Sequence, residues 1–136
     1  MAIWLYYYQL MLHILAICCG ASLGALARWR LGLWLSPGGA LPWGTLAANL
    51  IGGYLVGLIL AWAHHADLAP FWRLILVTGF LGALTTFSSF SAEVVGMLQQ
   101  QRYLLALGTA AAHLLGSLLL TIVGLHNATF LIADRA

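Results

Sequence analysis

The stretch from residue 74 to residue 92 reads LILVTGFLGALTTFSSFSA. It holds no charged residue, and its length is close to the roughly 20 apolar residues that cross a bilayer as a helix. Yet five Ser and Thr residues fall within the seven positions from Thr85 to Ser91. Hydroxyl side chains compete with helical hydrogen bonds, and Gly82 lowers helix propensity beside them. The stretch therefore predicts a membrane-spanning helix that is broken near its middle, around residue 83.

The rest of the chain has the same apolar character. Of its 136 residues, 63% are hydrophobic and only 6% are charged, against about 45–50% and 25% in soluble domains. Too little charge is present to cover a water-facing surface or to form the basic face of a nucleic-acid-binding domain. The sequence therefore predicts an all-α membrane protein in which residues 1–136 form a single transmembrane domain.

Four uncharged runs are long enough to span a bilayer. We place the four helices near residues 9–34, 42–63, 71–97 and 104–130. The turn-forming residues LSPGGA at 35–40 separate the first two helices, and Pro42 is expected in the first turn of the second. No Lys or Arg precedes Arg28, so we expect the first span to remain in the mature protein rather than to be a signal peptide.

The few arginines give almost no preferred orientation. With four spans, loops one and three share one side of the membrane and carry Arg28, Arg30 and Arg102. The opposite side carries Arg73 and Arg135, and the balance becomes equal if Arg28 is drawn into the protein. Cytoplasmic loops normally carry the arginine excess, so this chain is expected to insert both ways and to form an antiparallel homodimer. The alternative is that the balance is accidental in a small protein.

The expected break lies near the bilayer midplane, halfway between Arg73 and Glu93. Non-helical backbone at that depth must be buried in protein or line a cavity, and broken helices of this kind form ion sites in many transporters. Phe87 and Phe90 are spaced i, i+3 and share a face. Phenyl edges carry partial positive charge and attract a small anion weakly. Helix packing alone is the alternative explanation.

Two further spans carry polar side chains at helical spacing. Thr45 and Asn49 are spaced i, i+4 in the second span, and an amide can donate to an anion without attracting cations. Thr109, His113, Ser117 and Thr121 recur at the same spacing in the fourth span. These positions are candidates for a wet pathway, although contacts between helices would explain them equally well. Ionisable residues in or near the membrane are functional candidates too, here Arg28 and Glu93.

Three motifs together resemble the Fluc (CrcB) family of small fluoride channels. They are GASLGALARW at 20–29, GTLAANLIG at 44–52 and GFLGALTTFSSFSAE at 79–93. The resemblance implies a dual-topology homodimer with two antiparallel fluoride pores, each lined by both subunits. It also implies a structural sodium ion at the centre of the dimer.

The resemblance assigns roles to single residues. Phe87 and Phe90 match the pore phenylalanines, Asn49 matches the pore asparagine, and Arg28 resembles an arginine of the cytoplasm-facing vestibules. Gly82 and Thr85 match the positions whose backbone carbonyls hold sodium. Polar positions near the pathway are matched by Thr86, Ser89 and Glu93, and the fourth-span pore hydroxyls by Thr109, His113 and Ser117. At His113 this sequence has an imidazole where a small hydroxyl is expected.

We therefore predict passive fluoride export across the bacterial inner membrane by a multi-pass channel whose partners are fluoride, lipid and a second copy of itself. No arrangement of nucleophile, base and acid is apparent, so an enzyme is not expected. One alternative is a dual-topology proton-coupled exporter, but that function needs a carboxylate in the first span, and none is present. Another is an assembly subunit that transports nothing.

Overall fold

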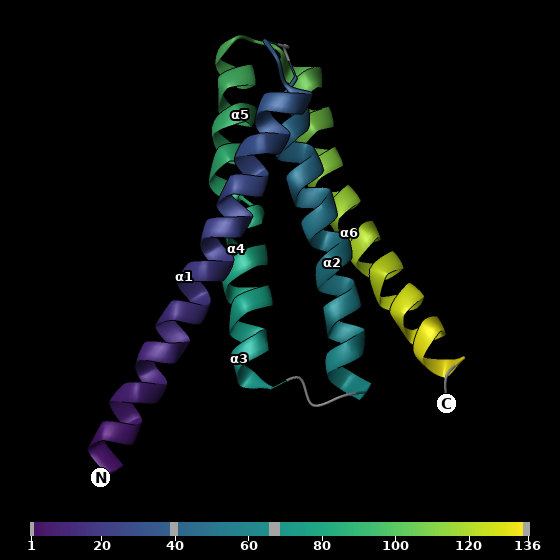
Figure 1. Cartoon of the computed structure of the whole chain (residues 1–136). Helices are drawn as coiled ribbons and strands as arrows, with labels where there is room; N and C mark the ends of the chain where they lie inside the picture. Colours follow the sequence, from purple (N-terminus) through teal and green to yellow (C-terminus); the bar gives the residue numbers. More distant parts are fainter. Residues whose placement is uncertain (1, 39–40, 66–68, 135–136) are drawn as a thin grey trace.

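The structure is a computed structural model that describes residues 2–38, 41–65 and 69–134. All regular structure in these ranges is helical, and four runs are long and apolar enough to cross a membrane. Figure 1 shows their arrangement. The elements are α1 (Ala2–Leu35), α2 (Trp43–His65), α3 (Pro70–Arg73), η1 (Leu74–Leu81), α4 (Gly82–Leu84), α5 (Phe87–Gln99) and α6 (Tyr103–Ala133). The predicted all-α membrane fold with four spans is confirmed.

The helix ends differ from the predicted ones, most of all at the first helix. It begins at Ala2 rather than at residue 9, because residues 2–8 contain no Gly, Pro or charged residue that would end an apolar helix. The other ends lie within three residues of the predicted positions. Pro42 directly precedes α2 instead of lying in its first turn, and its carbonyl accepts the first bond of that helix, from Leu46 N at 3.1 Å.

The third span is broken, as the hydroxyl-rich stretch predicts. Its first part, η1, is a π-helix that passes into the single turn α4. Thr85 (φ −80°, ψ 152°) and Thr86 (φ −151°, ψ 120°) are then extended, and α5 begins at Phe87. The break lies two residues beyond the predicted position because Gly82 keeps helical angles (φ −62°, ψ −30°). The hydroxyl residues, and not the glycine, therefore end the first half.

Hydroxyl groups bond to the backbone on both sides of the break. The Thr85 hydroxyl donates to the carbonyl of Leu81 at 2.9 Å. On the other side, Thr86 is the N-cap of α5, and its Oγ1 accepts a bond from the backbone N–H of Ser89 at 3.2 Å. An N-cap of this kind supplies an acceptor to an N–H that has no helical partner. The sequence TTFSS thus encodes the break and the start of the next helix.

Glycines let the helices pack closely in two pairs. α1 lies along η1 and α4, while α2 lies along α6. A side-chain carbon added at Gly20 or Gly24 would collide with carbonyl oxygens of η1, and one added at Gly53 or Gly57 would collide with carbonyl oxygens of α6. Small residues at helix contacts serve this purpose in membranes. The small-xxx-small spacing of Gly20 with Gly24 and of Gly53 with Gly57 is typical of such packing, and the structure shows these contacts.

The two helix pairs meet at one end of the molecule and spread toward the other (Figure 1). The start of α1 and the end of α6 both lie at the wide end, as four spans require. A small buried cluster, Ala48, Leu81 and Leu84, joins α2 to the third span. Large apolar side chains are otherwise mostly exposed, among them Leu104 at 88%, which suits a surface facing lipid.

Candidate functional site

A cavity of about 360 Å³ lies beside the break, between α2, the start of α5 and α6. We call it the central cavity. No charged side chain is among the described residues that line it. Eight of the polar and aromatic residues that the sequence singles out line this one space: Asn49, Thr85, Thr86, Phe87, Phe90, His113, Ser117 and Thr121. Tertiary packing therefore gathers candidates from three separate spans.

Asn49 holds the broken backbone. The N–H of Thr86 donates to Asn49 Oδ1 at 2.8 Å, and Asn49 Nδ2 donates to the carbonyl oxygen of Thr86 at 3.1 Å. Thr86 is buried, so these backbone groups would otherwise lack partners in the membrane. Nδ2 also lies 3.0 Å from His113 Nδ1. One amide side chain thus links the break in the third span to the fourth span.

Three rings form one wall of the central cavity. Phe87 and Phe90 lie on one face of α5, as predicted, with ring centroids 5.4 Å apart and planes at 64°. The ring of Phe90 stacks on the imidazole of His113 at 4.6 Å and 30°. Phe87 is 79% exposed although it borders the cavity. Its ring therefore faces a side of the chain that none of the described elements covers.

A second, more polar cavity of about 430 Å³ lies where α1, α2 and α5 approach one another. We call it the polar cavity. The Thr45 hydroxyl donates to Glu93 Oε1 at 2.5 Å, while the buried Oε2 of Glu93 has no partner within the described ranges. Ser36, Gln100 and Arg102 also line this space. Ser36 is far from Gln100 and Arg102 in the sequence, and no motif marks any of the three as a site residue.

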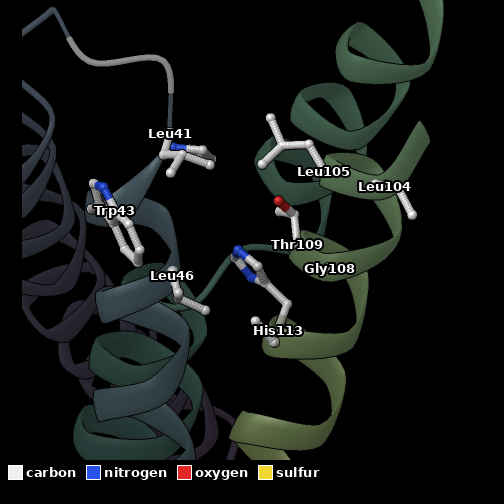
Figure 2. Close-up of a pocket in the computed structure, with 10 residues that line it drawn as sticks. Leu41, Trp43, Leu46, Leu104, Leu105, Gly108, Thr109 and His113 are labelled. Atoms are coloured by element: carbon white, nitrogen blue, oxygen red, sulfur yellow. The ribbon is translucent and has the colours of Figure 1, made fainter. Parts of the chain in front are cut away.

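A third cavity of about 220 Å³ separates the start of α2 from the first half of α6 (Figure 2). We call it the outer cavity. Its walls are mainly apolar, with Leu41 and Leu46 on the side of α2 and Leu104 and Leu105 on α6. Thr109 lines it, but the Thr109 hydroxyl donates to the sulfur of Met97 at 3.5 Å. His113 lines both the outer and the central cavity, so its ring stands between them.

Known proteins identify the family of this chain. Residues 15–125 match the family described as "CrcB-like protein, Camphor Resistance (CrcB)". The chain belongs to the CrcB family. A relative from Albidiferax ferrireducens, named "Fluoride-specific ion channel FluC", is 71% identical over 126 residues, which are 92% of this chain and 97% of the relative.

Other CrcB relatives carry the same name. The protein from Variovorax paradoxus is 65% identical over 91% of this chain and 100% of its own length. The protein from Pseudomonas aeruginosa is 53% identical over 88% of this chain and 95% of its own length. CrcB membership confirms the predicted family and agrees with the prediction that the chain is not an enzyme.

Some residues assigned by the CrcB resemblance lie outside the central cavity. Arg28 is half-buried on α1, with no acidic partner in the described part of the chain, and it lines none of the three cavities. Gly82 is exposed on the surface of α4. Ser89 contacts the N-cap residue of α5, with its Oγ 3.2 Å from Oγ1 of Thr86. A single chain therefore assembles most, but not all, of the positions that the resemblance names.

Proposed function

We propose that this chain forms a fluoride-selective channel that releases fluoride passively across the bacterial inner membrane. The central cavity carries the proposal, because it brings phenyl edges and polar groups together beside a helix break, and none of the described residues in its lining is charged. The name shared by the CrcB relatives supports fluoride as the ion.

The chemistry of this lining suits a small, strongly hydrated anion. Removing water from an ion is costly unless the protein replaces the lost hydrogen bonds. N–H and O–H groups with the ring edges of Phe87 and Phe90 would supply that replacement. A fixed positive charge in the pathway would bind the anion too tightly, whereas conduction requires that the ion can also leave.

A second copy inserted the opposite way would complete the channel. Phe87 is 79% exposed in one chain, and Gly82 is exposed on the same broken span. A two-fold axis in the membrane plane would bring the two breaks together and cover these positions. The near-equal arginine balance supports such dual insertion. We propose two antiparallel pores per homodimer, each lined by both copies.

The same arrangement would provide a structural sodium site. The last carbonyls of a helix have no intrahelical donors, and the end of α4 at Leu84 leaves carbonyls of residues 82–85 in that state. Oxygen ligands suit hard cations, so the carbonyl oxygens of Gly82 and Thr85 fit a sodium ion. One copy offers too few of them, and two copies would offer twice as many. The ion would hold the two breaks together.

Flux from purified protein in liposomes, followed with a fluoride electrode, tests the proposal. We expect rapid fluoride efflux, little chloride efflux and no need for a proton gradient. Chloride passing as fast as fluoride, or no efflux of either ion, would contradict the proposed function. A flux that required a proton gradient would instead favour the exporter, and a protein that transports nothing would favour the assembly subunit.

Two phenylalanine variants test the pathway. Phe87→Ile and Phe90→Ile remove ring edges, and we expect each to lower fluoride efflux roughly tenfold or more while the dimer survives. Phe71→Ile is the matched control, because the ring of Phe71 lies on α3 and lines neither the central nor the outer cavity. Full efflux in either pathway variant would remove the role proposed for that ring.

A further inference from the structure

The most deeply buried unpartnered nitrogen in the described residues belongs to His113. The side chain is 4% exposed, and its Nε2 has no hydrogen-bond partner there. Buried polar groups are nearly always paired, so an exception requires an explanation. The ring lines both the central and the outer cavity, and Figure 2 shows it pointing from α6 into the outer cavity. Its Nε2 is the ring nitrogen farther from the backbone.

The neighbours of His113 determine which ring nitrogen carries the proton. A backbone N–H can only donate, so the atom of Asn49 that pairs with the N–H of Thr86 is the oxygen Oδ1. This fixes the amide and places Nδ2 against the carbonyl of Thr86 and against His113 Nδ1. Since Nδ2 can only donate, His113 Nδ1 must accept. In a neutral imidazole the hydrogen is then on Nε2.

The same contacts assign the hydrogens of Asn49. An amide group has two N–H bonds, and here one points to the carbonyl of Thr86 while the other points to His113. Neither remains for an ion in the cavity. A doubly protonated imidazole is disfavoured as well, because its Nδ1–H would face the N–H of Asn49 donor to donor. The Asn49 contact thus keeps His113 neutral with a free Nε2–H.

From this network we infer that the Nε2–H of His113 is the donor that receives fluoride between the central and outer cavities. Asn49 is a positioning residue that sets the tautomer of His113. The inference rests on the proposed fluoride channel and deepens it. Hydrogen bonds to an ionised partner are stronger than neutral ones, so a neutral N–H can bind a halide. Because the imidazole carries no fixed charge, the halide can also leave. The stack on Phe90 keeps the ring in place.

Nitrogen NMR of the protein in vesicles, labelled at histidine, reads the tautomer directly. The signals of His113 are identified by subtracting the spectrum of His113→Phe. We expect Nδ1 without a proton and Nε2 with one, and we expect sodium fluoride, but not sodium gluconate, to move the Nε2–H signal. Asn49→Ala should yield a mixture of tautomers. A proton on Nδ1, or an Nε2–H signal that ignores fluoride in conducting vesicles, overturns the inference.

Flux measurements provide the second readout. His113→Phe keeps a ring to stack on Phe90 but removes the donor, and we expect fluoride efflux to fall about tenfold or more. His113→Gln retains an N–H and should keep efflux within about threefold of the original protein. Leu107→Met preserves volume at an exposed position of α6 that lines neither the central nor the outer cavity, and it should leave efflux unchanged.

These outcomes separate the inference from the proposed function. Wild-type efflux in His113→Phe, with the original protein conducting fluoride, overturns the role of His113 and leaves the channel standing. An original protein that passes no fluoride overturns the channel instead. If His113→Phe does not fold, the fluoride response of the Nε2–H signal in the unmodified protein, assigned by comparison with His113→Gln, decides the inference.

Discussion

The two halves of the third span are held in different ways. The first half, η1 and α4, is apolar and lies closely against α1, with Gly79 and Gly20 at the contact. The second half, α5, begins with a hydroxyl cap and is tied to α2 through Asn49 and Thr86. Its phenyl rings border the central cavity, and Phe87 is left largely uncovered.

This difference shows how one span can be both scaffold and site. The first half needs no polar partner, so close packing alone can anchor it. The second half carries the buried polar groups and the exposed ring, which cost stability and must be held by specific hydrogen bonds. If this contrast is right, substitutions that add volume should lower the free energy of unfolding most in the first half. Substitutions that remove single hydrogen bonds should lower it in the second half.

Gly24→Val should have the largest effect on folding. A Cβ at this position would meet backbone atoms of Phe80 and Leu84, and backbone cannot move aside as a flexible side chain can. We expect a loss of roughly 3 kcal/mol in the free energy of unfolding, measured as a lower unfolding midpoint in detergent. An unchanged midpoint would show that the first half is not anchored by its contact with α1.

Asn49→Ala should come next. It leaves the buried N–H and carbonyl of Thr86 without partners, which costs roughly 2 kcal/mol. The measurement is the same unfolding midpoint, together with faster hydrogen exchange at the amide of Thr86. Slow exchange at that amide in the variant would mean that another group bonds to the N–H of Thr86. The second half of the span would then not depend on the hydrogen bonds from Asn49.

Thr86→Val should have a smaller effect. Valine has the shape of threonine but no oxygen to accept the N–H of Ser89, and loss of an N-cap costs about 1 kcal/mol. Thr86→Ser keeps the acceptor and serves as the matched control. Equal unfolding midpoints for the valine and serine variants would argue against the cap as the start of α5.

Gly96→Ala should have the smallest effect and the opposite sign. Gly96 lies inside α5, and beyond the helix's own backbone no atom of the described residues lies within 4 Å of a Cβ added there. Alanine loses less backbone entropy than glycine on folding into a helix, so we expect a gain of about 0.5 kcal/mol. A loss as large as that of Gly24→Val would show that both halves of the span are packed alike.

Local patterns in the sequence predict much of this architecture. Uncharged runs mark the four spans, because hydrocarbon excludes charge whatever the fold. The hydroxyl-rich stretch marks the break, because Thr and Ser bond to nearby backbone at any position where they occur. The i, i+3 spacing places Phe87 and Phe90 on one face. The sequence places the start of α1 seven residues too late, because a long apolar helix carries no internal signal for where it begins.

The partners of the polar side chains could not be read from the sequence. Helical spacing puts Thr45 and Asn49 on one face of α2, but the pairing of Thr45 with Glu93 and of Asn49 with Thr86 depends on how α2 and the third span cross. Spacing likewise indicates a polar stripe on the fourth span. It does not say that the hydroxyl of Thr109 turns to Met97.

What the sequence determined by itself is therefore the set of local properties: which segments lie in the membrane, where the third one breaks and which glycines allow close contact. These follow from side-chain polarity and backbone freedom, which act within a few residues. Only the tertiary structure decided which buried donors are used and which remain free. Asn49 and His113 are 64 positions apart. Only the packing of α2 against α6 brings one amide against one ring nitrogen, and the other nitrogen has no hydrogen-bond partner among the described residues.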